Sequence, residues 1–444
     1  MKTMRTSWCA GIALCVIGVV SFVHAQAVER TLPESWQHLV PGGAFIDRFE
    51  PSLAKGPLTR DCWGADGVKP RDVLNGIEDA KYSYWGGNIR RDEKGKYHLF
   101  VARWLESQAK GHMYWHWSDV CHAVADCKEG PFKPLGDLGR GHNPEVFRCK
   151  DGSWCVYVIN GCYRAPTLDG PWKYGKLVLL GLDGKPTRDV TNYSFAERPD
   201  GSVLAVCRHG NIWLSPDGLA PFVRQTERSV YPAINITTFE DPVLWRDEVQ
   251  YNLIVNDWMG RVAWYLTSPD GISWRVMPGK AYGIDFAAVR TPDGTVTTNH
   301  WFKYERIHIY QDEYGRAVQA NFAVIDVLKR SDLGNDTHSS KNITVPLNPG
   351  RRASVVRQTA SGWTIRIKSE SGFDARKDVD VKSLTFGDPV EVAFGRGVKA
   401  LGSTPVGNDL DVTFPPSVLV GPIGKILGRE TGGRLLFCDL RVSH

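Results

Sequence analysis

Three observations predict that this chain folds as an all-β protein. Short apolar runs bounded by Asp-Gly or Pro-Asp-Gly turns dominate the 444 residues, and such runs are typical of β-hairpins. Tryptophan, tyrosine and glycine are plentiful, whereas long stretches with helical periodicity are scarce. The hairpins also recur at intervals of about 40 to 55 residues, which favours a repeat architecture.

Two kinds of hairpin turn alternate along the chain. The first kind separates two apolar strands, and it occurs at Asp92-Glu93-Lys94-Gly95, Asp151-Gly152, Asp200-Gly201, Asp247-Glu248 and Asp293-Gly294. The second kind is followed by an aromatic residue, as in Asp169-Gly170-Pro171-Trp172. Two hairpins in each period give four antiparallel strands, which is the composition of a propeller blade.

Three polar residues mark the register of the repeat. Asn143, Asn192 and Asp241 are successively 49 residues apart, and each stands just before the first strand of its unit. Equivalent positions in successive blades lie around one axis, so we expect these three side chains to face a common crevice.

Five blades are recognisable between residues 80 and 310, and the flanking regions 30–80 and 316–444 are also strand-like. Closing the ring with the two terminal regions would remove exposed sheet edges. The expected fold is therefore a seven-bladed β-propeller of four-stranded antiparallel blades, with residues 26–444 forming a single domain. The alternative is a five-bladed propeller followed by a C-terminal β-sandwich.

The N-terminal residues predict export. Lys2 and Arg5 precede an apolar run from Trp8 to Val23, and Val23-His24-Ala25 forms a small-residue cleavage site. Residues 1–25 are therefore expected to be a signal peptide, and the protein to be secreted or periplasmic. No later stretch approaches the roughly 20 apolar residues of a spanning helix, so we expect no membrane association.

The charge balance limits the class of partner. The 54 basic residues less Lys2 and Arg5 leave 52 against 49 acidic residues, so the exported chain is only mildly cationic. This argues against nucleic acid, for which a concentrated basic face would be expected. It is compatible with an anionic substrate. A monomer is expected.

Eight of the ten cysteines follow the predicted signal peptide, and an even number in an exported chain favours disulfides. Cys149 and Cys155 flank one hairpin turn and would bridge it, and Cys121 with Cys127 would close a loop. The alternative is a set of reduced, buried cysteines.

Polar residues that are unusual in simple strands gather at the blade mouths. A histidine, a tyrosine and an arginine in one pocket would suit proton abstraction next to a carboxylate, because the arginine offsets the charge that develops. They are Tyr84, Asn88, Arg103, His122, His142, Asn143, Tyr193, Arg208, His209, Glu240, Asp241, Tyr251, Asn256, His300, Lys303, Tyr304 and Arg306.

Two other functions remain open from the same residues. Glu145 and Asp241, with Asp47, would provide the separated carboxylates of a glycosidase. A carbohydrate-binding propeller without catalysis would instead stack sugars on tryptophans, namely Trp85, Trp104, Trp258 and Trp301. No histidine or cysteine spacing resembles a strong zinc motif, so no cofactor or metal is expected, and a structural ion is left open.

Several segments, in one order, resemble a family of bacterial ulvan lyases. They are Tyr84-Trp85-Gly86-Gly87-Asn88-Ile89-Arg90-Arg91, Lys110-Gly111-His112-Met113, Gly141-His142-Asn143-Pro144-Glu145, Phe239-Glu240-Asp241-Pro242-Val243, Asn252 to Arg261, Trp301-Phe302-Lys303-Tyr304-Glu305-Arg306, Gln319-Ala320-Asn321-Phe322-Ala323-Val324-Ile325-Asp326 and His338-Ser339-Ser340-Lys341. The resemblance implies a seven-bladed propeller that cleaves a sulfated anionic polysaccharide, ulvan. Cleavage would occur between 3-sulfated rhamnose and glucuronic or iduronic acid by β-elimination.

The resemblance also implies roles for individual residues. The paired catalytic histidines would be His122 and His142, the arginine that neutralises the uronate would be Arg208, and Tyr193 would act as acid or base. The expected substrate-binding residues are Asn143, His209, Tyr251, Lys303 and Arg306.

Overall fold

The computed structural model describes residues 27–60, 63–187, 191–234 and 236–442. Most of their regular structure is β-strand, so the all-β prediction is confirmed. The helices are short: η1 (Glu34–His38), η2 (Phe45–Arg48), η3 (Asp66–Val68), η4 (Gly111–Trp117), α1 (Ala375–Asp378) and α2 (Pro389–Ala393). Within the described ranges, no helix is long and apolar enough to cross a membrane. The predicted signal peptide and Cys62 lie outside these ranges.

Five blade-forming sheets follow one another between residues 82 and 346, and their strand pairs are antiparallel except for one at the edge of the third sheet. The first contains β2 (Tyr82–Arg91), β3 (Tyr97–Leu105), β4 (Asp119–Ala125) and β5 (Lys133–Arg140). The second contains β6 (Glu145–Arg148), β7 (Trp154–Val158), β8 (Gly161–Ala165) and β9 (Lys173–Gly175). The third contains β11 (Ser194–Glu197), β12 (Val203–Val206), β13 (Ile212–Ser215) and β14 (Phe222–Arg224), with β10 (Leu179–Leu180) at its edge.

The last two sheets complete this series. The fourth contains β15 (Phe239–Arg246), β16 (Tyr251–Asp257), β17 (Val262–Ser268) and β18 (Arg275–Lys280). The fifth contains β21 (Lys303–Gln311), β22 (Ala317–Ile325) and β23 (Ser340–Pro346).

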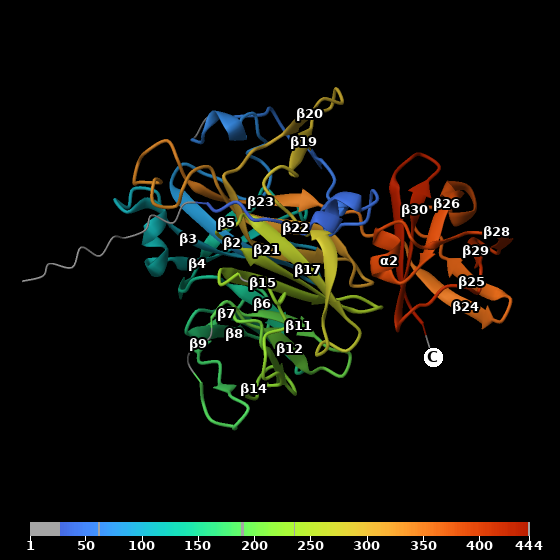
Figure 1. The fold of residues 1–444 in the computed structure, drawn as a ribbon. Coiled ribbons are helices and arrows are strands. Elements are labelled where there is room, and N and C mark those ends of the chain that lie inside the picture. The colour runs from blue at the N-terminus through green and yellow to red at the C-terminus, as the bar shows by residue number, and fades with distance from the viewer. Residues whose placement is uncertain (1–26, 61–62, 188–190, 235, 443–444) are drawn as a thin grey trace, which may run out of the picture.

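The first strands of these sheets form a closed ring. β2 contacts β6, β6 contacts β11, β11 contacts β15, β15 contacts β21, and β21 returns to β2. Each sheet therefore lies as one blade around a shared axis, as Figure 1 shows for residues 82–346. The seven-bladed prediction is not confirmed, because the described sheets close the ring at five.

The predicted Asp-Gly turns form the hairpins within the blades. In the turn between β6 and β7, the Asp151 carboxylate accepts the backbone N–H of Ser153 at 2.9 Å, and Gly152 has a φ of +88°. In the turn between β11 and β12, Asp200 and Ser202 make the same contact at 3.0 Å. The aspartate satisfies the turn backbone, and glycine adopts the left-handed conformation without a steric penalty.

The N-terminal segment covers the outer edge of the three-stranded fifth blade. Ile77 forms an isolated antiparallel bridge with Asn342 of β23, and the Asn75 side chain donates to the Thr344 carbonyl at 2.9 Å. Earlier in the same segment, β1 (Ser52–Leu53) joins a small sheet with β19 (Ala288–Arg290) and β20 (Val296–Thr298). The N-terminal segment thus protects a sheet edge without adding a blade.

The C-terminal residues form two packed sheets beside the ring (Figure 1). One contains β24 (Ala353–Thr359), β25 (Gly362–Ile367), β28 (Gly402–Val406) and β29 (Asp409–Phe414). The other contains β26 (Val379–Gly387), β27 (Val398–Lys399), β30 (Ile423–Glu430) and β31 (Leu435–Arg441). Their inward side chains share one core, which includes Ile365, Val412, Phe386 and Leu436. This sandwich is the alternative arrangement expected from the sequence, and these strands do not supply blades six and seven.

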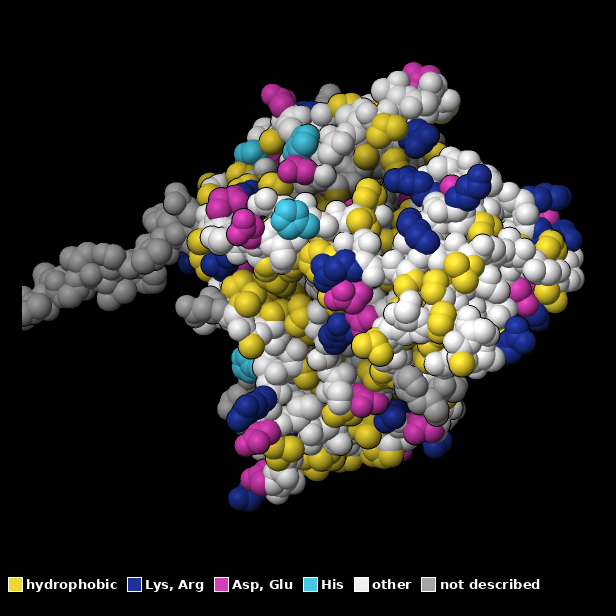
Figure 2. All heavy atoms as spheres, turned by 45° about the vertical axis from the view of Figure 1, so that its right-hand side comes forward, with side chains coloured by type: hydrophobic (Ala, Val, Ile, Leu, Met, Phe, Trp, Pro, Cys, Tyr) yellow, Lys and Arg dark blue, Asp and Glu magenta, His cyan; other side chains and the backbone are white. Residues whose placement is uncertain are grey.

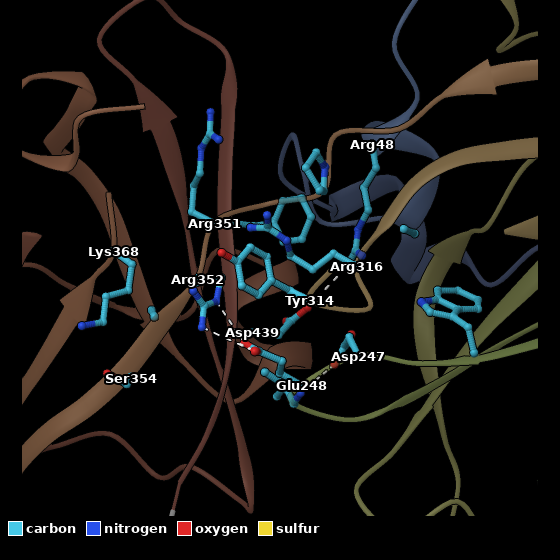
Figure 3. A pocket seen from close by; sticks show the side chains of 16 residues that line it. Arg48, Asp247, Glu248, Tyr314, Arg316, Arg351, Arg352, Ser354, Lys368 and Asp439 are labelled. Atoms are coloured by element: carbon cyan, nitrogen blue, oxygen red, sulfur yellow. Dashed lines mark hydrogen bonds and ion pairs between the residues drawn. The ribbon is translucent and has the colours of Figure 1, made fainter. Parts of the chain in front are cut away.

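The sandwich contacts the ring through ion pairs around a crevice of about 190 Å³ (Figure 3). Arg352 pairs with Glu248 at 3.0 Å, and Arg316 pairs with Glu370 at 2.9 Å. The Arg48 guanidinium lies 4.2 Å from the centre of the Phe437 ring. Both polar and cation–π contacts therefore connect the two parts.

The seven cysteines in the described ranges are unpaired, which corrects the predicted disulfides. Cys149 and Cys155 are both buried in the core between the second and third blades, where they pack with Phe147 and Phe195. Cys121 is buried in the first blade, whereas Cys127 is partly exposed in a loop. These buried cysteines act as small apolar side chains.

Charged side chains of both signs are mixed over the surface. Figure 2 shows Lys and Arg interspersed with Asp and Glu on one face, without a continuous basic patch there. On that face, the surface therefore lacks the electrostatic signature of nucleic-acid binding.

Candidate active site

A polar pocket of about 580 Å³ opens where the first strands of the blades begin. Every blade contributes to it, because the ring brings the mouths of β2, β6, β11, β15 and β21 around one axis. Its lining residues are Trp85, His112, Trp115, His116, Arg140, Gly141, His142, Asn143, Ile159, Asn160, Tyr174, Thr191, Asn192, Arg208, Glu240, Asp241, Glu305 and Lys329.

The floor of the pocket is built from a backbone feature that each blade repeats. Asn143 and Asn192 stand two residues before β6 and β11, and Gly86, Asp241 and Arg306 lie within β2, β15 and β21; all five have φ between +47° and +70°. In the first, fourth and fifth blades this residue lies in a β-bulge. A left-handed residue turns the strand locally and directs its side chain toward the axis.

The side chains at these positions form a chain of hydrogen bonds. Asn143 donates to Asn192 at 3.1 Å, and Asn192 donates to Asp241 at 2.9 Å. Arg306 donates to the Asp241 carboxylate at 3.2 Å and to the Asn143 carbonyl at 3.4 Å. The 49-residue spacing therefore predicted correctly that Asn143, Asn192 and Asp241 surround a common crevice.

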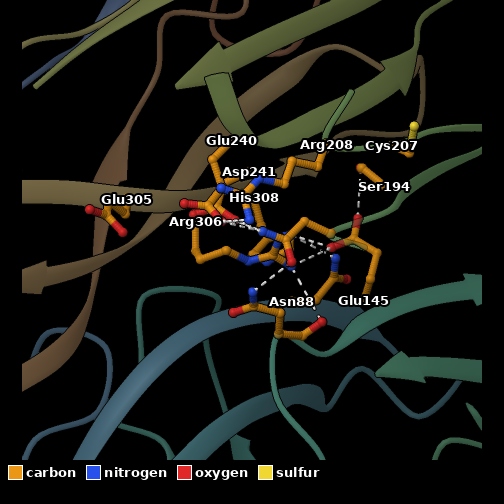
Figure 4. A network of polar contacts seen from close by, with 12 residues as sticks. Asn88, Glu145, Ser194, Cys207, Arg208, Glu240, Asp241, Glu305, Arg306 and His308 are labelled. Atoms are coloured by element: carbon orange, nitrogen blue, oxygen red, sulfur yellow. Dashed lines mark hydrogen bonds and ion pairs between the residues drawn. The ribbon is translucent and has the colours of Figure 1, made fainter. Parts of the chain in front are cut away.

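A second polar layer lies two residues further along four of these first strands, at Asn88, Glu145, Ser194 and His308 (Figure 4). Glu145 is completely buried; it accepts a hydrogen bond from Ser194 at 2.8 Å and contacts the His308 ring nitrogen Nδ1 at 2.8 Å. Arg306 lies 3.9 Å from Glu145, and Asn88 contacts His308 at 3.1 Å. His308 and Arg306 outweigh burial and lower the pKa of Glu145, so this carboxylate is a structural anion.

The Glu240 side chain is mostly buried but reaches the pocket. Its side chain is 20% exposed, it accepts a hydrogen bond from Asn192 at 3.0 Å, and it pairs with Arg208 at 3.1 Å. Burial and the neighbouring charges of Asp241 and Glu305 raise the pKa of Glu240 to about 7. A large fraction of Glu240 is therefore protonated at neutral pH.

Glu305 differs from Glu240 because two lysines hold it. The Lys329 ammonium lies 2.6 Å from one carboxylate oxygen, and the Lys303 ammonium lies 3.1 Å from the other. Burial opposes ionisation of Glu305, but the two lysines outweigh it and lower its pKa. The pocket thus contains one carboxyl group poised to give a proton and one held ionised.

His142 lines the pocket as a neutral imidazole. Burial, together with the charges of Arg306 and Lys329, lowers its pKa well below the usual value. The Ser118 hydroxyl donates to the Gly141 carbonyl at 2.8 Å, so the 2.9 Å contact between Ser118 and His142 assigns the proton to Nδ1. Nε2 of His142 is then a hydrogen-bond acceptor.

The nine site residues predicted from the sequence divide into three groups. Three of them, His142, Asn143 and Arg208, line the pocket. Arg306 is buried against Asp241 and Asn143, and Lys303 is buried against Glu305, so both support lining residues without lining the pocket themselves.

The other four predicted residues lie elsewhere. His122 is buried in β4, where it stacks on Phe100 at 4.7 Å, so it is not paired with His142. Tyr193 is buried in the core between the second and third blades, and Tyr251 in the core between the third and fourth. His209 is exposed but is not among the lining residues. A separation of 20 residues did not reveal that His122 is on the third strand of its blade.

The carboxylates and tryptophans of the two alternatives lie only partly in the pocket, where Asp241 and Trp85 are lining residues. Asp47 accepts backbone N–H groups of Gly42 and Ala44, outside the pocket, and Glu145 belongs to the buried layer. Of the tryptophans proposed to stack on sugars, Trp104 and Trp301 are buried and do not line the pocket.

Sequence reasoning missed several pocket residues. Glu305, between Tyr304 and Arg306, was not predicted. The left-handed backbone at Arg306 interrupts the strand alternation, so the alternation does not indicate that the Glu305 side chain faces the pocket. Lys329 follows the second strand of its blade, and Trp115 with His116 belongs to η4 between β3 and β4. These connecting segments differ from blade to blade, so the sequence repeat does not predict which of their residues reach the pocket. Within the described ranges, no group of three or more His, Cys, Asp or Glu residues is placed to hold a metal ion.

No protein-family model matches the sequence, and no curated protein matches it. The fold is similar to solved structures that include Zg3597, a family 117 glycoside hydrolase from Zobellia galactanivorans. The TM-score is 0.45 at 10% identity, over 68% of this chain and 90% of that one. The catalytic domain of a GH62 α-L-arabinofuranosidase from Coprinopsis cinerea gives a TM-score of 0.43 at 14% identity, over 68% and 97%. An α-L-arabinofuranosidase from Lactobacillus brevis gives 0.40 at 12% identity, over 60% and 91%.

These structures are glycoside hydrolases rather than polysaccharide lyases, which corrects the resemblance to ulvan lyases and the β-elimination inferred from it. The fold is also inconsistent with that resemblance, since the ring has five blades and His122 is remote from His142. At these identities and TM-scores the similarity assigns no activity, so a function has to rest on the pocket itself.

Proposed function

We propose that this protein is a glycoside hydrolase whose active site is the axial pocket. The observation that carries the proposal is the contrast between two carboxyl groups of one pocket: the pKa of Glu240 is raised to about 7, while that of Glu305 is lowered. Hydrolysis of a glycosidic bond needs one carboxylic acid to protonate the leaving oxygen and one carboxylate to assist attack.

In this proposal Glu240 is the general acid. Its partial exposure lets it reach a glycosidic oxygen in the pocket, and Asn192 holds the carboxyl group in place at 3.0 Å. The negative charge of Asp241 contributes to the raised pKa of Glu240, so Asp241 tunes the acid.

Glu305 is the ionised partner in this mechanism. It accepts the proton of an attacking water or attacks the anomeric carbon, and the configuration of the product distinguishes these two roles. The Nε2 acceptor of His142 would orient a sugar hydroxyl.

The protein is further proposed to work outside the cytoplasm, in the secreted or periplasmic compartment, as a monomer. The sequence of residues 1–25 supports export. We also propose that the propeller, residues 82–346, and the sandwich, residues 353–442, are separate structural units, each supported by its own sheets and core.

The test uses purified protein with 4-nitrophenyl glycosides, including the α-L-arabinofuranoside and the β-D-xylopyranoside, and with xylan, arabinan and agarose. New reducing ends without the ultraviolet absorbance of an unsaturated uronate are expected. Glu305→Gln should abolish hydrolysis, and the matched control Glu248→Gln, at a carboxylate outside the pocket, should retain it. Full activity of Glu305→Gln would exclude the proposed mechanism.

A second variant isolates the acid. Glu240→Gln is expected to lower kcat on a polysaccharide by about 10²–10⁴-fold, the usual contribution of general acid catalysis. The loss should be much smaller on 4-nitrophenyl glycosides, because nitrophenolate leaves without protonation. Equal losses on both substrates would contradict the role of Glu240.

A further inference from the structure

Two aromatic side chains are exposed at one rim of the pocket. The chain has 16 tryptophans, 15 tyrosines and 17 phenylalanines, yet within the described ranges only Trp117 and Tyr174 are exposed, by 48% and 58%. Tyr174 lines the pocket, and Trp117 directly follows Trp115 and His116, which also line it. Exposing these rings costs hydrophobic free energy, so their location at the same rim indicates a binding role.

A series of contacts links the two rings across the first and second blades. Tyr174 packs on Tyr163 with ring centres 5.2 Å apart, and the Tyr163 hydroxyl donates to the Arg140 carbonyl at 2.7 Å. The Arg140 guanidinium in turn donates to the Trp117 carbonyl. The exposed rings therefore belong to one supported surface.

Each ring also has its own support. A Cβ atom at Gly161 would lie 2.3 Å from the Tyr174 hydroxyl oxygen, so glycine at this position lets the tyrosine lie across β8. The Trp117 ring lies 5.2 Å from that of Tyr114. Between them, the Arg140 side chain is 67% exposed and lines the pocket.

We propose that Trp117 and Tyr174 bind successive sugar rings of a polysaccharide chain that extends out of the pocket, with Arg140 donating to hydroxyl groups between them. This inference rests on the proposed function. The C–H faces of a sugar carry partial positive charge and pack against the negative face of an aromatic ring. The enzyme would then act on polymers rather than on isolated disaccharides.

Binding is tested separately from turnover in the Glu240→Gln background, where a polymer stays intact. Affinity electrophoresis in gels containing arabinoxylan, linear xylan or agarose measures Kd. Trp117→Ala and Tyr174→Ala are each expected to raise Kd by about threefold to tenfold, and the double variant by at least about tenfold. Trp117→Phe should restore most of the affinity. Leu419→Ala, at an exposed apolar residue of the sandwich, serves as the matched control.

With Glu240 intact, the double variant should lose more kcat/KM on the polymer than on a 4-nitrophenyl monosaccharide. Unchanged Kd in the double variant, or no retardation of the Glu240→Gln protein in any gel, would overturn the inference. Failure of the proposed function has a different signature: Glu240→Gln and Glu305→Gln would then hydrolyse glycosides like the wild type, while polymer binding would still depend on Trp117 and Tyr174.

Discussion

Two glutamates of one pocket differ in pKa because their neighbours differ. Glu240 is near Asp241 and Glu305 and pairs directly with the partly exposed Arg208, so burial and like charge outweigh Lys329 and Arg208 and raise its pKa to about 7. Glu305 contacts two lysine ammonium groups, within 3.1 Å, and its pKa is lowered. Residue type alone therefore does not define the acid and its ionised partner; the local charges do.

The rate of hydrolysis should depend on pH through these two groups. The acid must be protonated, so kcat/KM is expected to fall as pH rises through about 7, the pKa of Glu240. It should also fall at acidic pH, where Glu305 becomes protonated. Initial rates across the pH range measure both limbs. An alkaline limb that persists unchanged in Glu240→Gln would assign it to another group.

Arg208 should set the position of the alkaline limb. Its positive charge lowers the pKa of Glu240, so Arg208→Ala is expected to raise that pKa and move the limb to higher pH. Arg208→Lys retains the charge and serves as the control. A limb that moves to lower pH in Arg208→Ala would contradict the ion pair seen at 3.1 Å.

Glu145 is expected to contribute stability rather than chemistry. Its folded-state pKa is lowered, so its contribution is present above the unfolded-state pKa and is lost as pH falls through the folded-state pKa. Glu145→Gln leaves His308 without its buried anion and Arg306 with Asp241 alone, and it should cost about 3–5 kcal/mol at neutral pH. Urea denaturation at neutral and acidic pH measures the difference, which should shrink at low pH.

At the level of elements, the first strand of each blade is defined by its left-handed residue. Gly86, Asn143, Asn192, Asp241 and Arg306 share this conformation although their side chains differ. The shared backbone places an amide at the axis from the second and third blades, a carboxylate from the fourth and a guanidinium from the fifth, whereas Gly86 of the first blade adds no side chain. A repeated backbone feature thereby produces an asymmetric pocket.

Asn192 permits a test of this arrangement. Asn192→Ala removes hydrogen bonds to Asn143, Glu240 and Asp241, and places alanine at a φ of +53°. Asn192→Gly removes the same bonds without the steric cost. Asn192→Ala should therefore be less stable than Asn192→Gly by about 1 kcal/mol in urea denaturation. Equal stability of the two variants would indicate that the left-handed backbone is not retained.

At the level of the whole molecule, the sandwich and the ring are joined by charged contacts. Arg316 stands in the hairpin between β21 and β22, where it contacts Asp312 at 2.8 Å and Glu370 of the C-terminal region at 2.9 Å. The side chain of Arg316 is only 15% exposed, so these ion pairs are less screened than those on the surface.

Removing that arginine should weaken the connection between the two parts. Arg316→Ala is expected to lower the free energy of unfolding by about 1–3 kcal/mol and to broaden or split the calorimetric transition. Arg396→Ala removes an exposed ion pair with Glu391 and is the matched control. If the two variants give the same Tm, Arg316 does not connect the sandwich to the ring.

The sequence predicted the parts of this fold that depend on local chemistry. Asp-Gly turns require a left-handed glycine and an aspartate that accepts turn N–H groups, so the hairpins at Asp151 and Asp200 were identifiable. The spacing of Asn143, Asn192 and Asp241 likewise revealed the axis. The number of blades was not identifiable, because strands of a sandwich and strands of a blade have the same alternating pattern.

The sequence by itself determined the all-β class, the repeat and the ring of polar residues at the blade mouths. The tertiary structure decided the closure at five blades, the separation of His122 from His142 and the assembly of Glu240, Glu305 and Lys329 in one pocket. The physical reason is that some contacts form between neighbours in the sequence and others only between distant segments. Turns and bulges are set by neighbouring residues, whereas the pKa of each pocket carboxylate depends on charges that only ring closure brings together.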